Sequence, residues 1–64
     1  MHYPTKPTRL ARRAITAARR AERYDCDQLA DCARLTARLA RRELIDMIGV
    51  PATARLLAAV GGAS

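Results

Sequence analysis

The sequence predicts a single all-α domain, a small three-helix bundle in which an antiparallel helical hairpin is followed by a short apolar third helix. Three observations support this prediction. Alanine, the strongest helix former, occurs 14 times among the 64 residues. Apolar residues recur at intervals of three and four over residues 8–24 and 26–48, as they do on one side of a helix. Gly and Pro, which interrupt helices, occur only near the two ends of the chain and at residues 49–51.

The first helix is expected over residues 8–24. Residues 1–7 contain two prolines and predict an extended lead-in, after which Thr8 suits the N-cap position. The helix should end where Asp25 offers a new N-cap and Gln28 occupies the capping-box position of the next helix. Because this break contains neither Gly nor Pro, one continuous bent helix is the alternative, and we favour a tight hairpin.

The second helix is expected over residues 26–48 and has an unusually wide apolar arc of roughly 220°, whereas a helix that packs on one side needs about 100°. This width predicts that neighbours cover the helix from two directions. The arc consists of Leu29, Cys32, Ala33, Thr36, Leu39, Ala40, Leu44 and Met47, flanked by Leu35, Ala37 and Ile48. Ile45 falls on the polar side, beside Arg38 and Arg41. Ile45 and Leu35, which lies at the edge of the arc, are either incidental or in contact with another chain.

The third helix is expected over residues 51–60, which are almost all apolar. Gly49 suits the end of the second helix, and Pro51 suits the first turn of the third. Residues 61–64 predict a short tail, so that a single helical domain spans residues 8–60.

The small size of the domain bears on its stability. A chain of 64 residues buries only about 60% of its unfolded surface. We therefore expect marginal stability in a monomer, and a partner or a homodimer would add to it.

Charge is concentrated on the first helix. Six arginines fall within an arc of roughly 120° at 100° per residue. They are Arg9, Arg12, Arg13, Arg19, Arg20 and Arg23. The opposite side is apolar and rich in alanine, and the one acid, Glu22, lies off the arginine arc. Arginines spaced three or four residues apart on a helix repel one another, and each such pair costs a few tenths of a kcal/mol. A helix that needed only to be soluble could relieve this repulsion with interleaved Glu, so the pattern predicts an anionic partner in preference to a merely solvated face.

Two kinds of partner fit the arginines. Phosphates of nucleic acid are one, and arginine also recognises guanine edges. An acidic protein surface is the other, since arginine pairs with carboxylates through two parallel hydrogen bonds. We favour a small DNA- or RNA-binding regulator. The alternative is an adaptor or inhibitor, of the kind that accessory or mobile-element genes encode, docking on an acidic surface of a host protein. Binding to anionic lipid is disfavoured, because the apolar side of the first helix is mostly Ala and inserts poorly.

The segment ELIDMIGVPATARLL, residues 43–57, resembles a helix-turn-helix, in which a Gly-Val pair joins two short helices. The resemblance implies that Thr53 and Arg55 face DNA while the first helix grips phosphates. This copy departs from the family pattern, since Ile45 occupies a position where the family usually has a small residue. The same residues are also explained by a helix that ends at a glycine and is followed by a helix that begins at a proline.

Catalysis finds almost no support in the sequence. Neither Cys26 nor Cys32 has a nearby His, and the chain lacks paired inward carboxylates, a Gly-rich phosphate loop and a metal-ligand cluster. We therefore expect no enzyme activity, no cofactor, no metal and no small-molecule substrate, and we expect both cysteines to be small buried thiols. No stretch approaches the roughly 20 apolar residues of a membrane span, and no signal peptide is visible, which predicts a soluble cytoplasmic protein.

Overall fold

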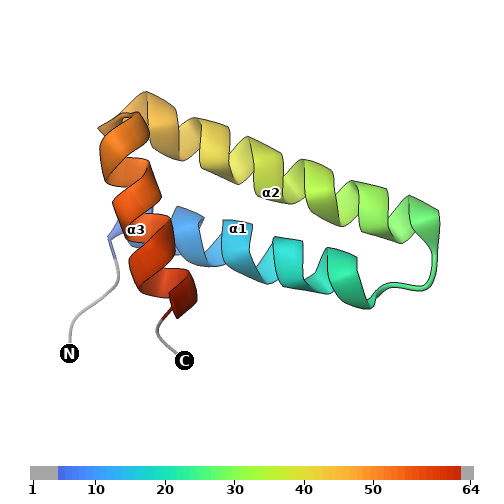
Figure 1. Cartoon of the computed structure of the whole chain (residues 1–64). Helices are drawn as coiled ribbons and strands as arrows, with labels where there is room; N and C mark the ends of the chain where they lie inside the picture. Colours follow the sequence, from blue (N-terminus) through green and yellow to red (C-terminus); the bar gives the residue numbers. More distant parts are fainter. Residues whose placement is uncertain (1–4, 63–64) are drawn as a thin grey trace.

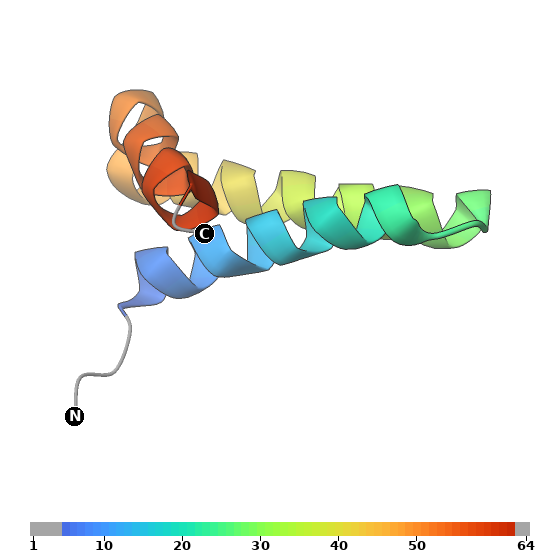
Figure 2. The same cartoon turned by 60° about the horizontal axis from the view of Figure 1, so that its bottom comes forward.

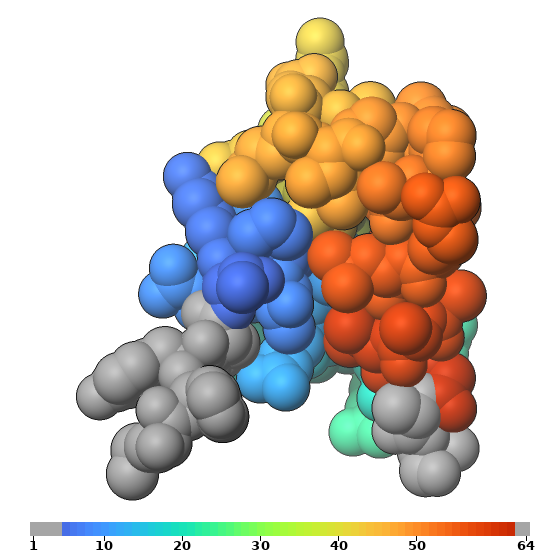
Figure 3. All heavy atoms as spheres, turned by 90° about the vertical axis from the view of Figure 1, so that its left-hand side faces the viewer, coloured from blue at the N-terminus to red at the C-terminus, as the bar shows by residue number. Residues whose placement is uncertain are grey.

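Three helices make up residues 5–62, the part of the chain that the computed structural model describes (Figure 1). They are α1 (Lys6–Arg23), α2 (Asp27–Ile48) and α3 (Val50–Gly62). α1 and α2 run antiparallel as a long hairpin, and α3 crosses that hairpin at one end (Figures 1 and 2). Figure 3 faces this end and shows the start of α1 (blue) beside α3 (red), beneath the end of α2. The predicted all-α bundle of three helices, with its antiparallel hairpin, is confirmed.

α1 begins earlier than the sequence analysis predicts. Thr5 is the N-cap: its backbone is extended, and its Oγ1 accepts a hydrogen bond from the Thr8 backbone N–H at 3.3 Å. Pro7 lies in the first turn, where its missing N–H costs nothing because that N–H would have no helical partner. The prediction of Thr8 as N-cap is therefore wrong, and the helix already includes Lys6 and Pro7 of the expected lead-in. Residues 1–4 lie outside the described range.

A short connection separates α1 from α2. The Tyr24 backbone N–H donates to the Arg20 carbonyl at 3.2 Å, and Tyr24 itself is extended. Cys26 is the N-cap of α2, and its side chain makes no capping hydrogen bond. The predicted cap at Asp25 is thus displaced by one residue. Asp27 occupies the first turn instead, where its carboxylate suits the positive end of the helix dipole.

The junction between α2 and α3 is a single glycine. Gly49 has φ 84° and ψ 167°, which side-chain-bearing residues avoid, and its N–H donates to the Ile45 carbonyl at 2.8 Å. The predicted glycine end of α2 is confirmed. α3 runs on through Gly62, beyond the predicted end at residue 60. Its last turn lies against α1, where a methyl group at Gly61 would come within 3.1 Å of Ile15 Cδ1. This contact with α1 stabilises the last turn of α3, which would otherwise fray because glycine is a poor helix former.

Alanine fills most of the core. Nine hydrophobic residues are buried in the described range, and seven of them are alanines. Two leucines, Leu10 and Leu44, supply the larger buried side chains, and residues of α3 pack around them. The partly buried neighbours are Ile48, Leu56, Leu57 and Val60. Such a core removes little apolar area from water per residue, which agrees with the marginal stability expected from the chain length.

The prediction that α2 is covered from two directions is wrong for much of its length. Four large apolar side chains of α2, Leu29, Leu35, Leu39 and Met47, are 44 to 56% exposed. α3 has 13 residues and is about 20 Å long, against about 33 Å for the 22 residues of α2. Because α3 also crosses the hairpin near one end, it leaves the rest of α2 uncovered (Figure 1).

None of the helices in residues 5–62 combines the length and the apolar character that crossing a bilayer requires.

Candidate functional site

The six predicted arginines all lie on α1, and all are exposed. We call this set, Arg9, Arg12, Arg13, Arg19, Arg20 and Arg23, the arginine face. A straight helix places its first and last members about 21 Å apart. The Ala-rich side of α1 packs against the rest of the bundle, which turns the arginine face away from the core. The helix therefore acts as a scaffold that displays guanidinium groups along one edge of the hairpin.

Within residues 5–62 no carboxylate lies within 4.0 Å of any member of the arginine face. The two ion pairs found there are Lys6 Nζ to Glu43 Oε1 at 3.8 Å, and Arg34 Nη1 to Asp31 Oδ1 at 2.8 Å. Arg42 and Asp46, four residues apart on α2, do not approach within 4.0 Å. The repulsion along α1 is thus not relieved by carboxylates of the described chain.

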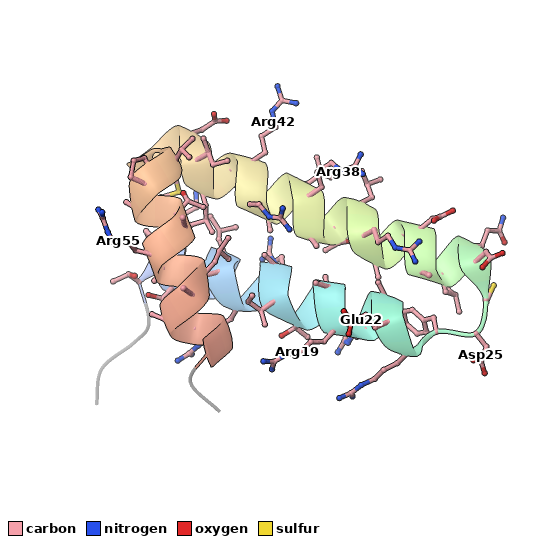
Figure 4. All side chains as sticks on the ribbon, viewed as in Figure 1. Arg19, Glu22, Asp25, Arg38, Arg42 and Arg55 are labelled. Carbon is pink, nitrogen blue, oxygen red and sulfur yellow. The ribbon has the colours of Figure 1, made fainter. Side chains whose placement is uncertain are left out.

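Arg19 differs from the other members of the arginine face. Its Nη2 donates a hydrogen bond to the Gly61 carbonyl oxygen at 3.1 Å, which ties α1 to the end of α3. The last carbonyls of a helix carry partial negative charge, so a guanidinium there is favourable. In Figure 4, Arg19 lies on the side of α1 away from α2. No signal in the sequence indicates this role, because only the return of α3 to α1 creates it.

A groove runs between α1 and α2 beside the arginine face, and its volume is about 480 Å³. α1 contributes guanidinium groups to it, and α2 contributes small and apolar side chains. The lining residues are Arg9, Arg12, Arg13, Thr16, Ala17, Arg20 and Tyr24 of α1 and the adjoining connection, with Leu29, Cys32, Ala33 and Thr36 of α2. The groove can therefore receive anionic groups along one wall and apolar or planar groups along the other.

The predicted interface residues of α2 separate into different surroundings. Arg38 and Arg41 are exposed and help to line a second groove of about 310 Å³ with Glu22 and other residues. Figure 4 shows Arg38 and Arg42 projecting from α2 on the side away from α1. Leu35 is exposed as expected, whereas Ile45 is partly buried. The structure does not bring Leu35 and Ile45 into one patch.

The two helix-turn-helix candidates have opposite environments. Thr53 is only 3% exposed, and its Oγ1 has no hydrogen-bond partner among the described residues. Arg55 is exposed and projects from α3 away from the hairpin (Figure 4). A buried Thr53 cannot touch a DNA surface, so this pair does not form the base-reading edge that the resemblance implies.

Metal-ligating side chains do not converge in the described range. No group of three or more His, Cys, Asp or Glu residues is placed to hold an ion there. The prediction that the cysteines are buried is wrong, since Cys26 and Cys32 are both exposed free thiols. Cys26 lies in the connection before α2, and Cys32 lies on the side of α2 that α3 does not reach.

No protein-family model, curated protein or solved structure matches the chain.

Proposed function

We propose that the chain is a non-enzymatic, nucleic-acid-binding regulator that contacts phosphates through the arginine face. One observation carries the proposal: six guanidinium groups are exposed along one helix, and no carboxylate of residues 5–62 neutralises them. Phosphates would relieve the repulsion between neighbouring arginines and would release condensed counterions from the nucleic acid. The planar guanidinium is also suited to bidentate phosphate contacts.

The dimensions of α1 agree with this proposal. About 21 Å of helix corresponds to roughly six phosphate steps along one strand of duplex DNA. Arg19 uses one donor on Gly61, and its guanidinium retains its charge and its other N–H groups. Most contacts should therefore be to the backbone of the nucleic acid, which gives affinity with little sequence preference.

Fluorescence anisotropy with labelled duplex DNA and with RNA, measured across a salt series, tests the proposal. Five or six phosphate contacts on duplex DNA predict a log–log slope of about −4.5 to −5.4. Reversing two charges, Arg12→Glu with Arg20→Glu, should weaken binding about 100-fold at low salt while circular dichroism stays helical. Arg19 is left intact in this variant because it also holds α3.

A matched control separates the arginine face from net charge alone. Arg38→Glu with Arg55→Glu changes the net charge by the same amount at exposed positions on α2 and α3. This control should retain most of the binding. Equal losses in the two double variants would show that general positive charge, and not the arginine face, attracts the nucleic acid.

A second candidate is an adaptor or inhibitor that binds an acidic amphipathic segment of another protein. The groove between α1 and α2 favours it, because arginines face Leu29 and Ala33 across that groove. Affinity for such a partner should fall less steeply with salt, since part of the interface is apolar. Capture from cell lysate with and without nuclease distinguishes the two. A protein band that survives digestion and requires the arginine face supports this candidate over the first.

A further inference from the structure

The apolar side chains that α2 leaves exposed lie on one side of the helix. Leu29, Leu35, Leu39 and Met47 fall within an arc of roughly 120°, centred about 120° from the buried side of α2 that packs against α1 and α3. We call these four residues the leucine stripe. Single exposed apolar residues are ordinary on a monomer, whereas several along one face indicate an interface. Gln28, Glu43 and Asp46 lie in the same arc, and Lys6 Nζ lies 3.8 Å from Glu43 Oε1.

The charges of the two long helices assign them to different partners. α1 carries seven basic residues and one acid, whereas α2 carries four of each. Anionic groups would therefore be drawn to α1, whereas α2 offers them no net positive charge. A second α2 is also neutral overall, so two such helices can meet without net repulsion.

The leucine stripe is arranged symmetrically along α2. The midpoint of Asp27–Ile48 falls between Ala37 and Arg38. Leu35 and Leu39 flank this midpoint, and Leu29 and Met47 lie near the two ends at almost equal distances from it. A twofold axis at the midpoint places each Leu35 opposite Leu39 of a second copy, and each Leu29 opposite Met47. This is the self-complementary pattern that a twofold interface requires.

The flanking charges favour the same antiparallel direction. Asp31 and Arg42 lie on one flank of the leucine stripe, within about 20° of each other around the helix. In antiparallel pairing the same flanks of the two helices meet, so Asp31 of each copy lies near Arg42 of the other. In parallel pairing this flank would meet the opposite flank of the other copy, where neither charge has a charged partner. Asp31 already pairs with Arg34 in its own chain, so the contact between copies selects orientation more than it adds stability.

We propose that the chain forms a homodimer in which the leucine stripes of two α2 helices pack antiparallel. The core of a single copy is mostly alanine, and packing the two stripes together would bury large side chains that the monomer leaves in water. The arginine face lies on α1 and forms no part of the stripe, although Leu29 also lines the groove beside that face.

Sedimentation velocity and light scattering at increasing chain concentration test the dimer. We expect twice the 7.0 kDa chain mass at high concentration. Leu35→Glu with Leu39→Glu should give a monomer that is still helical by circular dichroism, because both side chains are more than half exposed in a single copy. Val50→Glu is the matched control, since Val50 is 63% exposed but lies outside the stripe, and it should remain dimeric.

The orientation has its own test. Asp31→Arg or Arg42→Asp alone should weaken the dimer, and the two together should restore it by exchanging the charges. A wild-type chain that stays at 7.0 kDa, or a stripe variant that remains dimeric, overturns the proposal. A double exchange no better than the single variants overturns the antiparallel pairing. The Arg12→Glu, Arg20→Glu variant should keep the dimer mass, so loss of dimer and loss of nucleic-acid binding can be told apart.

Discussion

The guanidinium of Arg19 donates a hydrogen bond to the carbonyl oxygen of Gly61, 42 residues later in the chain, at 3.1 Å. This contact joins α1 to the last turn of α3, which carries no side chain of its own at Gly61 or Gly62. An arginine on a predicted binding surface thus also has a structural role.

Replacing Arg19 with Ala should lower the free energy of unfolding by about 0.5–1 kcal/mol, the usual net value of one hydrogen bond, and should loosen the end of α3. Urea denaturation gives the first quantity, and amide hydrogen exchange at the end of α3 gives the second. Arg12→Ala is the control, because Arg12 is exposed and makes no hydrogen bond within the described chain. Equal effects from both substitutions would contradict a special role for Arg19.

Gly49 tests how strongly the backbone specifies the corner between α2 and α3. Its φ of 84° and ψ of 167° are open to glycine but strained for an L-residue, and nothing lies within 4 Å of an added Cβ. Gly49→Ala should therefore destabilise the fold by about 1–3 kcal/mol through backbone strain alone. Thermal unfolding measures the loss. Chemical synthesis with D-alanine at this position should recover the stability, and a D-alanine chain as unstable as the L-alanine one would rule out this explanation.

The two terminal glycines of α3 form a natural comparison. An added Cβ at Gly62 meets nothing within 4 Å, whereas at Gly61 it would lie 3.1 Å from Ile15 Cδ1. Alanine is favoured over glycine in a helix by up to about 1 kcal/mol, so Gly62→Ala should stabilise α3, by less than this at a helix end. Gly61→Ala should stabilise it less, because Ile15 must shift. Unfolding curves for both variants measure the two changes in stability. A larger increase in stability for Gly61→Ala than for Gly62→Ala would mean that Ile15 accommodates the methyl group freely.

Thr53 has a buried hydroxyl without a partner in the described residues. Valine has nearly the same shape and a similar helix propensity, so Thr53→Val should raise the free energy of unfolding by about 1 kcal/mol. The same variant should leave nucleic-acid affinity unchanged, since the side chain does not reach the surface. Chemical denaturation and anisotropy report the two effects. A destabilised variant would show that the hydroxyl has a hydrogen-bond partner. A loss of nucleic-acid affinity would support the helix-turn-helix interpretation.

Local sequence signals predicted most of the fold. Helical periodicity and alanine content identified the helices, and Gly49 with Pro51 marked the corner before α3 correctly. The ends of the helices are harder to predict, because several residues in each connection can act as an N-cap. Thr5, and not Thr8, caps α1, which places Pro7 in the first turn, where a proline is tolerated. Cys26 caps α2 without a side-chain bond, so no pattern of polar residues could identify it.

Tertiary arrangement accounts for the remaining differences. Periodicity shows that α2 is apolar over a wide arc, but it does not show that α3 crosses at one end and leaves Leu35 and Leu39 exposed. The same crossing buries Thr53 and brings Gly61 to Arg19. The arrangement of the arginines followed directly from the sequence, since it needs only the pitch of one helix.

The contact between α1 and α2 is made largely by alanines, among them Ala11, Ala14 and Ala40. An alanine side chain has a single conformer, so burying it freezes no rotamers, and the two helices can associate with little loss of side-chain entropy. Methyl groups of equal size, however, offer no steric steps that distinguish one longitudinal alignment from another. Leu10 and Leu44, the two large side chains buried among these alanines, are therefore the residues that fix the longitudinal alignment of the two helices.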